Sequence, residues 1–535
     1  MNGQPAAAPA PHPFTLRLAL GLVGVLIAAL SSGLNDRVTD IALADIRAAL
    51  GISYDQGSWL IAGYQAAEVA AMMIAPWFAV TLSLRRFALA VAFGFGLVAA
   101  LLPFVTHYPL FLALRVLQGI FGGALPPLLM TVALRFLPPG IKLYGLSAYA
   151  LTATFGPNVA ASLAAFWTDA VGWQFVFWQI VPPLLLAGVL IGWGLPQDPL
   201  RLERFKQMDL FGMLTGCSGV ALMELTLSQG ERLDWLQSPL ITGMLCASVA
   251  LLVAFLINEW SHPLPLFKLQ LLQRKNLTHG LLVLAGVLLV ALSGSALPSA
   301  YFAQVEGFRT VQFAPLALAI GLPQLLIAPF MAFLLNLRWI DCRWMLTCGA
   351  ALLSVSCLMG AQLTDDWARQ NFWLIQLLQA FGQPMLILPV LMSATSVILP
   401  PEGPYASAMF NTVRGFSSVA AGSLVENFLT HREKFHSHTL VDQLGNRPWL
   451  MTAANSADAS AMKPLLPDGS ASSAENLGHF ATLLKHQAVI LSISDAYLML
   501  IAFALLLILL TAWLPKRVWP PQTLLQQPVT PKPGI

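Results

Sequence analysis

Long apolar runs recur along this chain, fourteen of them, each close to twenty residues. A helix needs about 20 mostly apolar residues to cross the hydrocarbon core of a bilayer. Only helices and closed barrels can span that core, because every backbone polar group there must be paired within the protein. A transmembrane barrel would show alternating strands of ~10 residues, whereas these runs are continuously apolar. The sequence therefore predicts an all-α integral membrane protein.

The spans are placed by the runs, and their orientation is predicted by the basic residues between them. An even number of spans puts both termini on one side. With the N-terminus in the cytoplasm, the short inner segments hold sixteen Lys and Arg and the short outer segments five, as the positive-inside rule requires. The predicted spans are 16–34, 57–78, 87–106, 109–134, 144–166, 174–195, 209–228, 239–258, 277–300, 312–335, 345–363, 372–398, 404–428 and 490–514.

An internal repeat divides the chain. Residues 115–139 and 376–401 align with an offset of about 260 residues, so that Gln118 matches Gln379 and both segments end in Pro-Pro. Eight spans separate the copies, so both have the same orientation. Two parallel six-helix halves, with two helices inserted between them, fit this pattern, and the interface of such halves holds the binding site near mid-membrane. The alternative is a chance resemblance between leucine-rich helices.

The repeat predicts the domain boundaries. Short cytoplasmic tails are expected at both ends, and a long outer loop in the second half. The predicted units are a tail over 1–15, a six-helix bundle over 16–195, two inserted helices with linkers over 196–276, a second bundle over 277–514 that includes a periplasmic loop over 429–489, and a tail over 515–535.

Arg115 lies within an apolar run, where a charge is costly unless it faces a protein interior or a wet cavity. Gln118 follows one turn later on the same face. Gly119 and Gly123 form a small-xxx-small pair that lets a neighbouring helix approach closely, and Pro126-Pro127 are expected to break the ladder of backbone hydrogen bonds within this span. The functional interpretation is a charge beside a transport path; the alternative is an Arg that reaches the membrane interface or only orders packing.

Four acids lie in or at the ends of the runs: Asp36, Asp40, Glu68 and Glu224. Burial favours the neutral form of a carboxyl group and a nearby Arg favours the charged form, so each is a candidate for binding a proton or a cationic cargo. Glu68 is mid-span and the strongest candidate. Asp36 and Asp40, one turn apart, are alternatively an exposed pair for Arg37, and Glu224 lies outside the repeats, which favours a structural role.

Arg414 is a second intramembrane cation, with Asn411 one turn earlier; substrate-binding and packing roles are both open. The chain has no G-x-x-x-x-G-K-[ST] phosphate-binding loop, and no residue pattern typical of a hydrolase or of a metal site. Its net charge of +3 gives no reason to expect a nucleic-acid partner. We therefore expect no catalytic residues, no cofactor and no bound metal, and transport driven by an ion gradient or running downhill.

Six ordered motifs and one further segment resemble one family. The motifs are RVLQGIFGG (115–123), TFGPNVAAS (154–162), GWQFVFWQIVPP (172–183), SQGERLDWLQSP (228–239), PLFKLQLLQRKNLTHG (265–280) and ILPPEGPYASAMFNTVRGF (398–416), and the further segment is LTHREKFH (429–436). Together they resemble the major facilitator superfamily, specifically the fourteen-span drug:proton antiporters of the EmrB/QacA type. The resemblance implies the major facilitator fold, with Gly156 and Pro157 as the hinge of the antiporter motif.

The resemblance also implies a function. It implies proton-driven export of amphipathic organic compounds across a bacterial inner membrane, with an EmrA-like periplasmic adaptor and a TolC-like outer-membrane channel as partners. The alternatives are a uniporter or importer of a small metabolite on the same fold, and a scaffold or sensor that transports nothing. The outer segment 429–489 is expected to dock an adaptor or to extend a helical hairpin above the membrane; the alternative is a disordered insertion.

Several residues depart from the family pattern. The first span carries Asn35-Asp36 where the family has Leu-Asp-x-Thr, so the acid is displaced by one position. The loop before Arg85 and Arg86 lacks the Asp and Gly residues that normally form an inner gate contact. The antiporter motif ends in Ala160-Ala161 in place of Gly-Gly. These differences indicate a divergent member.

Overall fold

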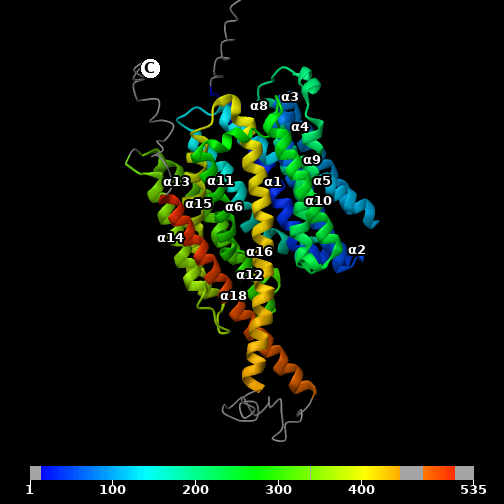
Figure 1. The fold of residues 1–535 in the computed structure, drawn as a ribbon, viewed down its shortest axis with the longest axis vertical. Coiled ribbons are helices and arrows are strands. Elements are labelled where there is room, and N and C mark those ends of the chain that lie inside the picture. Colours follow the sequence, from blue (N-terminus) through cyan, green and yellow to red (C-terminus); the bar gives the residue numbers. More distant parts are fainter. Residues whose placement is uncertain (1–13, 338, 446–473, 513–535) are drawn as a thin grey trace, which may run out of the picture.

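Helices make up the computed structural model, which describes residues 14–337, 339–445 and 474–512, and no strand occurs in these ranges (Figure 1). The helices of the first half are α1 (Leu16–Ile41), α2 (Leu43–Leu50), α3 (Tyr54–Leu82), α4 (Leu84–Leu101), α5 (Tyr108–Phe136), α6 (Lys142–Phe166), α7 (Phe175–Trp178) and α8 (Val181–Gly194). Two further helices follow, α9 (Leu210–Gly230) and α10 (Pro239–Ser261). The rest are α11 (Lys275–Ala291), α12 (Ala296–Gln304), α13 (Thr310–Asn336), α14 (Cys342–Gly360), α15 (Arg369–Thr395), α16 (Gly403–Gly445) and α18 (Ala474–Ala512).

Twelve helical segments of the described chain are long and apolar enough to cross a membrane. Every predicted span coincides with a helix or a pair of short consecutive helices. The two outside the twelve are α6 and α16, which are long enough, at 25 and 43 residues, but less apolar. Both carry polar side chains that face the protein interior. The all-helical membrane fold is therefore confirmed, and the count of fourteen spans stays a prediction.

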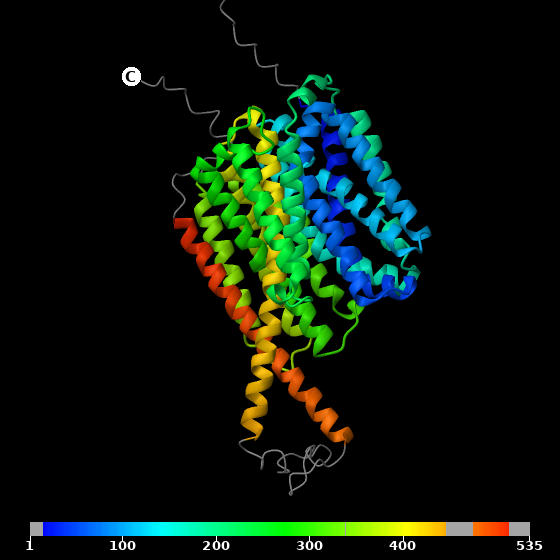
Figure 2. The ribbon, with the colours of Figure 1, turned by 45° about the vertical axis from the view of Figure 1, so that its right-hand side comes forward.

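Two groups of helices lie side by side, α1 to α8 in one and α11 to α18 in the other (Figure 2). Within the first group α3 packs on α5, and α1 on α8; within the second α14 packs on α15 and α18. The groups meet where α6 packs on α13 and where α3 and α5 pack on α16. This packing supports the two parallel halves, while the exact unit boundaries stay predictions.

The inserted helices attach to this core through one of their members. α9 packs on α10, and its other neighbours are α3 of the first half and α16 of the second. The side chains of α10 are largely exposed, as expected for a helix that faces lipid. Only α9 is thus in a position to take part in the interface between the halves.

The start of α1 and the end of α18 lie at one end of the molecule, while α16 and α18 extend together beyond the opposite end (Figure 1). Asp495 of α18 joins them there, since it lies 2.5 Å from Arg432 and 2.7 Å from His436, both of α16. The predicted helical hairpin is confirmed for residues 429–445 and 474–489. Residues 446–473 of that loop, 1–13 of the first tail and all of the tail over 515–535 lie outside the described residues.

The predicted span over 109–134 contains Pro126 and Pro127, and α5 runs unbroken through both to Phe136. Proline has no N–H group, so these two residues leave the carbonyl oxygens four positions earlier, of Gly122 and Gly123, without their usual helical donors. Thr131 and Ser407 both donate to the carbonyl oxygen of Pro127, at 2.8 and 2.7 Å, and Ser407 thereby links α16 to α5.

Candidate transport site

A cavity of about 100 Å³ lies between the two halves. Helices α1, α3 and α6 line it from one side and α11 and α16 from the other. Four charged side chains face it, two acidic and two basic. The lining residues are Gly33, Asp36, Arg37, Gln65, Glu68, Val69, Met72, Thr152, Ala153, Pro157, Leu288, Arg414, Gly415, Ser418 and Val419.

The two acids of the cavity are Asp36 of α1 and Glu68 of α3, both buried from the outside. They come from different helices because α1 and α3 both border the interface. In the described chain, neither carboxylate forms a close bidentate ion pair with a basic side chain. The nearest cation to Asp36 is Arg37, whose Nε lies 3.9 Å from the Asp36 carboxylate. Two carboxyl groups that share a small cavity repel one another when both are charged, which favours proton uptake by one of them.

Arg37 is a cavity residue that the sequence interpretation assigned only as an ion-pair partner. Its guanidinium donates to the Ser418 hydroxyl on α16, at 3.0 Å. It therefore links the two halves across the cavity. The one available signal was its place beside Asp36 in the departure from the family's first-span motif.

Asp40 does not join the site. It is an exposed residue 4.0 Å from Arg37, at the end of α1. Asp36, one turn earlier, is buried and lines the cavity, whereas Asp40 is not among the lining residues. The predicted shared face of the two acids is thus only partly used, with Asp36 in the cavity and Asp40 outside it.

Arg414 and Asn411 of α16 both contact α6. Arg414 donates to the Thr152 hydroxyl at 2.8 Å and lies 5.5 Å from the ring centre of Tyr149. The Tyr149 hydroxyl in turn donates to Asn411, at 2.9 Å. These contacts close the cavity from one side with groups of both halves, so that any separation of the halves breaks them.

Arg115 and Gln118 lie behind the cavity wall, fully buried in α5. Arg115 donates to the Gln118 side-chain oxygen at 2.6 Å and lies 4.2 Å from the centre of the Tyr64 ring. Among the described residues no carboxylate lies within 4 Å of Arg115, although the charges of Asp36 and Glu68 act on it. A buried permanent cation of this kind favours negative charge on the cavity acids.

The glycines of two motifs serve close helix packing. A β-carbon at Gly119 or Gly123 would overlap the backbone carbonyl oxygen of Tyr64 or Glu68 on α3. The predicted close approach is therefore confirmed, and α3 is the neighbour. Gly156 is buried where α6 passes α1 near Gly33.

Pro157, next to Gly156, lines the cavity within an unbroken α6. The hinge role of both residues stays a prediction.

The second half carries the equivalent positions without charge. With the offset of the repeat, Gln376 occupies the place of Arg115 and Gln379 that of Gln118, and both are buried. Gln379 donates to the hydroxyls of Ser293 and Ser356, at 2.7 and 2.9 Å. The charge of Arg115 therefore has no equivalent in the second half, where the matching positions form a neutral hydrogen-bond network.

Glu224 is separated from the cavity and lies in α9, 1 % exposed. Among the described residues, neither of its carboxyl oxygens has a hydrogen-bond partner. It is not among the residues that line the cavity. Of the predicted site residues, Asp36, Glu68, Pro157 and Arg414 line the cavity, Arg115, Gln118, Asn411 and Gly156 support it, and Asp40 and Glu224 lie outside.

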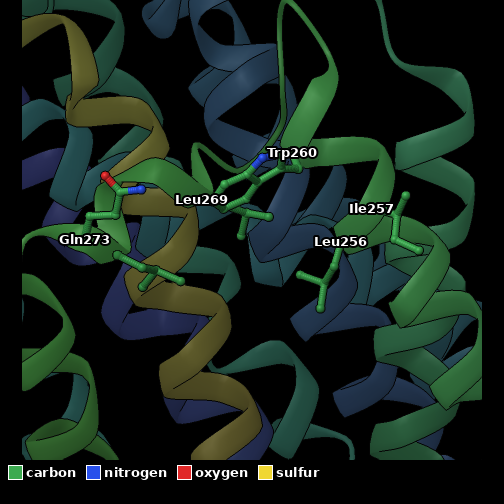
Figure 3. Close-up of a pocket in the computed structure, with 6 residues that line it drawn as sticks. Leu256, Ile257, Trp260, Leu269 and Gln273 are labelled. Atoms are coloured by element: carbon green, nitrogen blue, oxygen red, sulfur yellow. The ribbon is translucent and has the colours of Figure 1, made fainter.

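A larger hollow, of about 550 Å³, lies at the end of α10 and is different in kind (Figure 3). It has no titratable side chain and opens to the outside of the helix bundle. Its lining is Leu256, Ile257, Trp260, Leu269, Leu272 and Gln273. An apolar, open surface of this type suits lipid chains, and it offers nothing that could couple to an ion.

Comparison with known proteins agrees with this geometry. The sequence profile of the Major Facilitator Superfamily matches residues 25–422. The chain is 26% identical to the probable multidrug resistance protein EmrY of Escherichia coli, with 78% of this chain and 81% of that protein covered. It is 22% identical to the multidrug export protein EmrB of Escherichia coli, with 90% and 92% covered.

Solved structures show the same fold. The human organic anion transporter MFSD10 superimposes with a TM-score of 0.54 at 14% sequence identity, over 92% of this chain and all of that one. The family resemblance predicted from the ordered motifs is thereby confirmed. With helices long and apolar enough to cross a membrane, charged groups around a cavity between two bundles and a family profile over most of its length, this chain belongs to the Major Facilitator Superfamily and is a multi-pass membrane transporter, not an enzyme.

Proposed function

We propose that this transporter exports amphipathic organic compounds in exchange for protons that move inward. The observation that carries the proposal is the pair of cavity acids, Asp36 and Glu68, enclosed with Arg37 and Arg414 between the two halves. Charged groups in so small a volume bind a proton or a cationic cargo in competition, since each relieves the same repulsion. Competition for one site is the simplest basis for exchange.

Alternating access follows from where the polar contacts lie. Arg37–Ser418 and Arg414–Thr152 both run from one half to the other. When the halves rock apart on one side, these contacts break and the acids meet water, so that a bound proton is released or taken up. When the halves close, the acids lose water and the neutral or cargo-paired state is favoured.

The cargo class is supported by the relatives. Proteins named for multidrug export and resistance align over most of this chain. The cavity offers the apolar side chains of Val69, Met72 and Leu288 beside its charges, which suits a molecule with a greasy body and a basic group. We therefore use ethidium, an amphipathic organic cation, as the test probe.

The deciding experiment is Glu68→Gln in proteoliposomes with an imposed proton gradient. We expect gradient-driven ethidium movement to fall to background. The variant should still insert into the membrane and unfold at the same temperature as wild type. Glu426→Gln, an exposed glutamate on α16, is the matched control and should transport as wild type. Normal transport by Glu68→Gln would remove this residue from the mechanism, and flux that survives collapse of the gradient would favour a uniporter.

We further propose a bacterial inner-membrane location with both termini cytoplasmic, as the distribution of Lys and Arg indicates. The extension of α16 and α18 then projects into the periplasm, where it would meet an EmrA-like adaptor that leads to a TolC-like channel. Lys434 is exposed on this extension. Crosslinking from Lys434 or His436 to a co-expressed adaptor tests the contact, and no crosslinked product would contradict it.

A further inference from the structure

Glu224 is a predicted site residue, buried in α9, to which the proposed mechanism gives no role. It is 1 % exposed, and both carboxyl oxygens lack a hydrogen-bond partner in the part of the chain that the structure describes. A buried charge without a partner is so unfavourable that the group takes up a proton instead. A glutamate kept at such a position, where leucine would pack without this penalty, requires a reason.

The contacts of α9 place Glu224 beside the wall of the central cavity. Cys217 of α9 contacts the carbonyl oxygen of Ala70 on α3. Gln229 of α9 donates to the carbonyl oxygen of Ser58, also on α3. Glu224 lies between Cys217 and Gln229 on α9, and the matching stretch of α3 between Ser58 and Ala70 carries Gln65 and Glu68. Both of these residues line the cavity.

The second neighbour of α9 gives the same position. Ser423 of α16 donates to the carbonyl oxygen of Leu227 at 2.6 Å, and Asn427 donates to Glu231 at 2.8 Å. The helices run in the same direction with constant register, so Glu224 is level with the turn of α16 that carries Val419. Val419 also lines the cavity. Glu224 therefore lies at the seam where α3 and α16, one from each half, meet α9.

Several titratable groups lie on the elements around α9. α3 carries Tyr54, Asp55, Tyr64 and Glu68, residues 403–430 of α16 carry Tyr405, Arg414 and Glu426, and α10 carries the exposed Cys246 and the buried Glu259. Of these, Glu68 is the group whose charge acts on Glu224. Protonation at one carboxyl therefore changes the proton affinity of the other, as Coulomb's law requires for two like charges in a poorly solvated region.

We propose that Glu224 is a second proton-binding carboxyl, coupled to Glu68 through the seam between α3 and α16, and that the inserted helix α9 thereby belongs to the transport machinery. Glu224 holds its proton while the seam is closed. Movement of α3 against α16 opens the seam to water, and the proton is then exchanged in step with that of Glu68. This inference rests on the proposed function for the use of the proton, but its chemistry is measured separately.

Carbodiimide labelling tests the coupling without any cargo. A carbodiimide modifies carboxyl groups in their protonated form, so the purified full chain is labelled from about pH 5 to about pH 9 and the adduct at Glu224 is quantified by mass spectrometry. We expect an adduct at Glu224 whose midpoint pH falls by about half a unit or more in Glu68→Gln, because a neighbouring negative charge is removed.

Glu259→Gln is the matched control. Glu259 is the buried glutamate of the other inserted helix and accepts a hydrogen bond from the Phe267 amide. Its removal should leave the midpoint at Glu224 unchanged. Absence of the adduct at every pH, or a midpoint that does not move in Glu68→Gln, overturns the coupling.

A second measurement tests the transport role. In proteoliposomes with ethidium as the probe, Glu224→Gln should lower the number of protons moved per ethidium by one and leave ethidium binding in place. An unchanged ratio overturns the role in transport. If wild type moves ethidium without protons, the proposed antiport fails, whereas the labelling result still decides whether Glu68 and Glu224 are coupled.

Discussion

Gly123 of α5 lies directly against the backbone of Glu68 of α3, so that a single methyl group at position 123 would overlap the Glu68 carbonyl oxygen. This contact positions the cavity acid through helix packing. Glu68, which carries the charge, and Gly123, which has no side chain, thus belong to one packing contact between α3 and α5.

Gly123→Ala should lower the free energy of unfolding by about 1–3 kcal/mol, since α3 and α5 must separate to admit the methyl group. Gly188→Ala is the control, because nothing lies within 4 Å of a β-carbon at that position of α8. Thermal unfolding in detergent measures both. Equal stability of the two variants would contradict the close packing of α3 on α5.

Thr152→Val should weaken the closed state, because it removes the hydroxyl that Arg414 contacts across the halves at 2.8 Å. A hydrogen bond to a charged group is worth about 1.5–3 kcal/mol, so the closed population should fall roughly tenfold or more relative to the open one. Thr154→Val is the control, since that hydroxyl bonds within α6, to Ala150.

Spin labels at two exposed positions near the outer ends of α6 and α13, Phe166 and Val311, measure the distance between the halves. Longer distances are expected for Thr152→Val, but not for Thr154→Val. Identical distance distributions in wild type and Thr152→Val would show that this contact does not hold the cavity shut.

Glu402→Gln should destabilise the protein in a pH-dependent way. Although burial raises its pKa, hydrogen bonds from Arg274 and Lys268 lower the pKa of Glu402 from its ordinary value of 4.5 to about 2. A lowered pKa contributes stability above pH 4.5 that is lost as the pH falls toward 2. The difference in stability between wild type and variant should therefore be full at neutral pH and shrink below pH 4.5.

Unfolding midpoints in detergent between neutral pH and about pH 3 measure this difference. Glu203→Gln, an exposed glutamate of another loop, is the control and should show little change. A difference between Glu402→Gln and wild type that stays constant as the pH falls would contradict the ion pairs with Arg274 and Lys268.

Asp495→Asn should loosen the projecting pair of helices, because Asp495 of α18 holds both Arg432 and His436 of α16. Partly exposed ion pairs are worth up to about 1 kcal/mol, so limited proteolysis of the extension should speed up roughly fivefold. Glu433→Gln is matched to it, since Glu433 accepts only from Ser437 of its own helix among the described contacts. Equal cleavage rates would show that the cluster does not join the helices.

Local pattern was sufficient for the fold. Apolar runs of bilayer length predicted the helices, because each run is a local property of the chain. The repeated Gln118 and Gln379 indicated two halves, because a repeat is found by aligning the chain with itself. Contacts between distant residues were not accessible in this way: the Ser407 hydroxyl donates to the carbonyl oxygen of Pro127, which is 280 residues away.

The sequence by itself determined that the chain is a helical membrane protein of a known family with charges buried in its spans. Only the tertiary structure decided which charges meet. Asp36 reaches the cavity and Asp40 does not, Arg37 contacts a residue 381 positions away, and Glu224 lies against α3 although it belongs to neither half. The physical reason is that hydrophobicity acts on each helix separately, whereas the site exists only where helices from both halves and the inserted pair pack together.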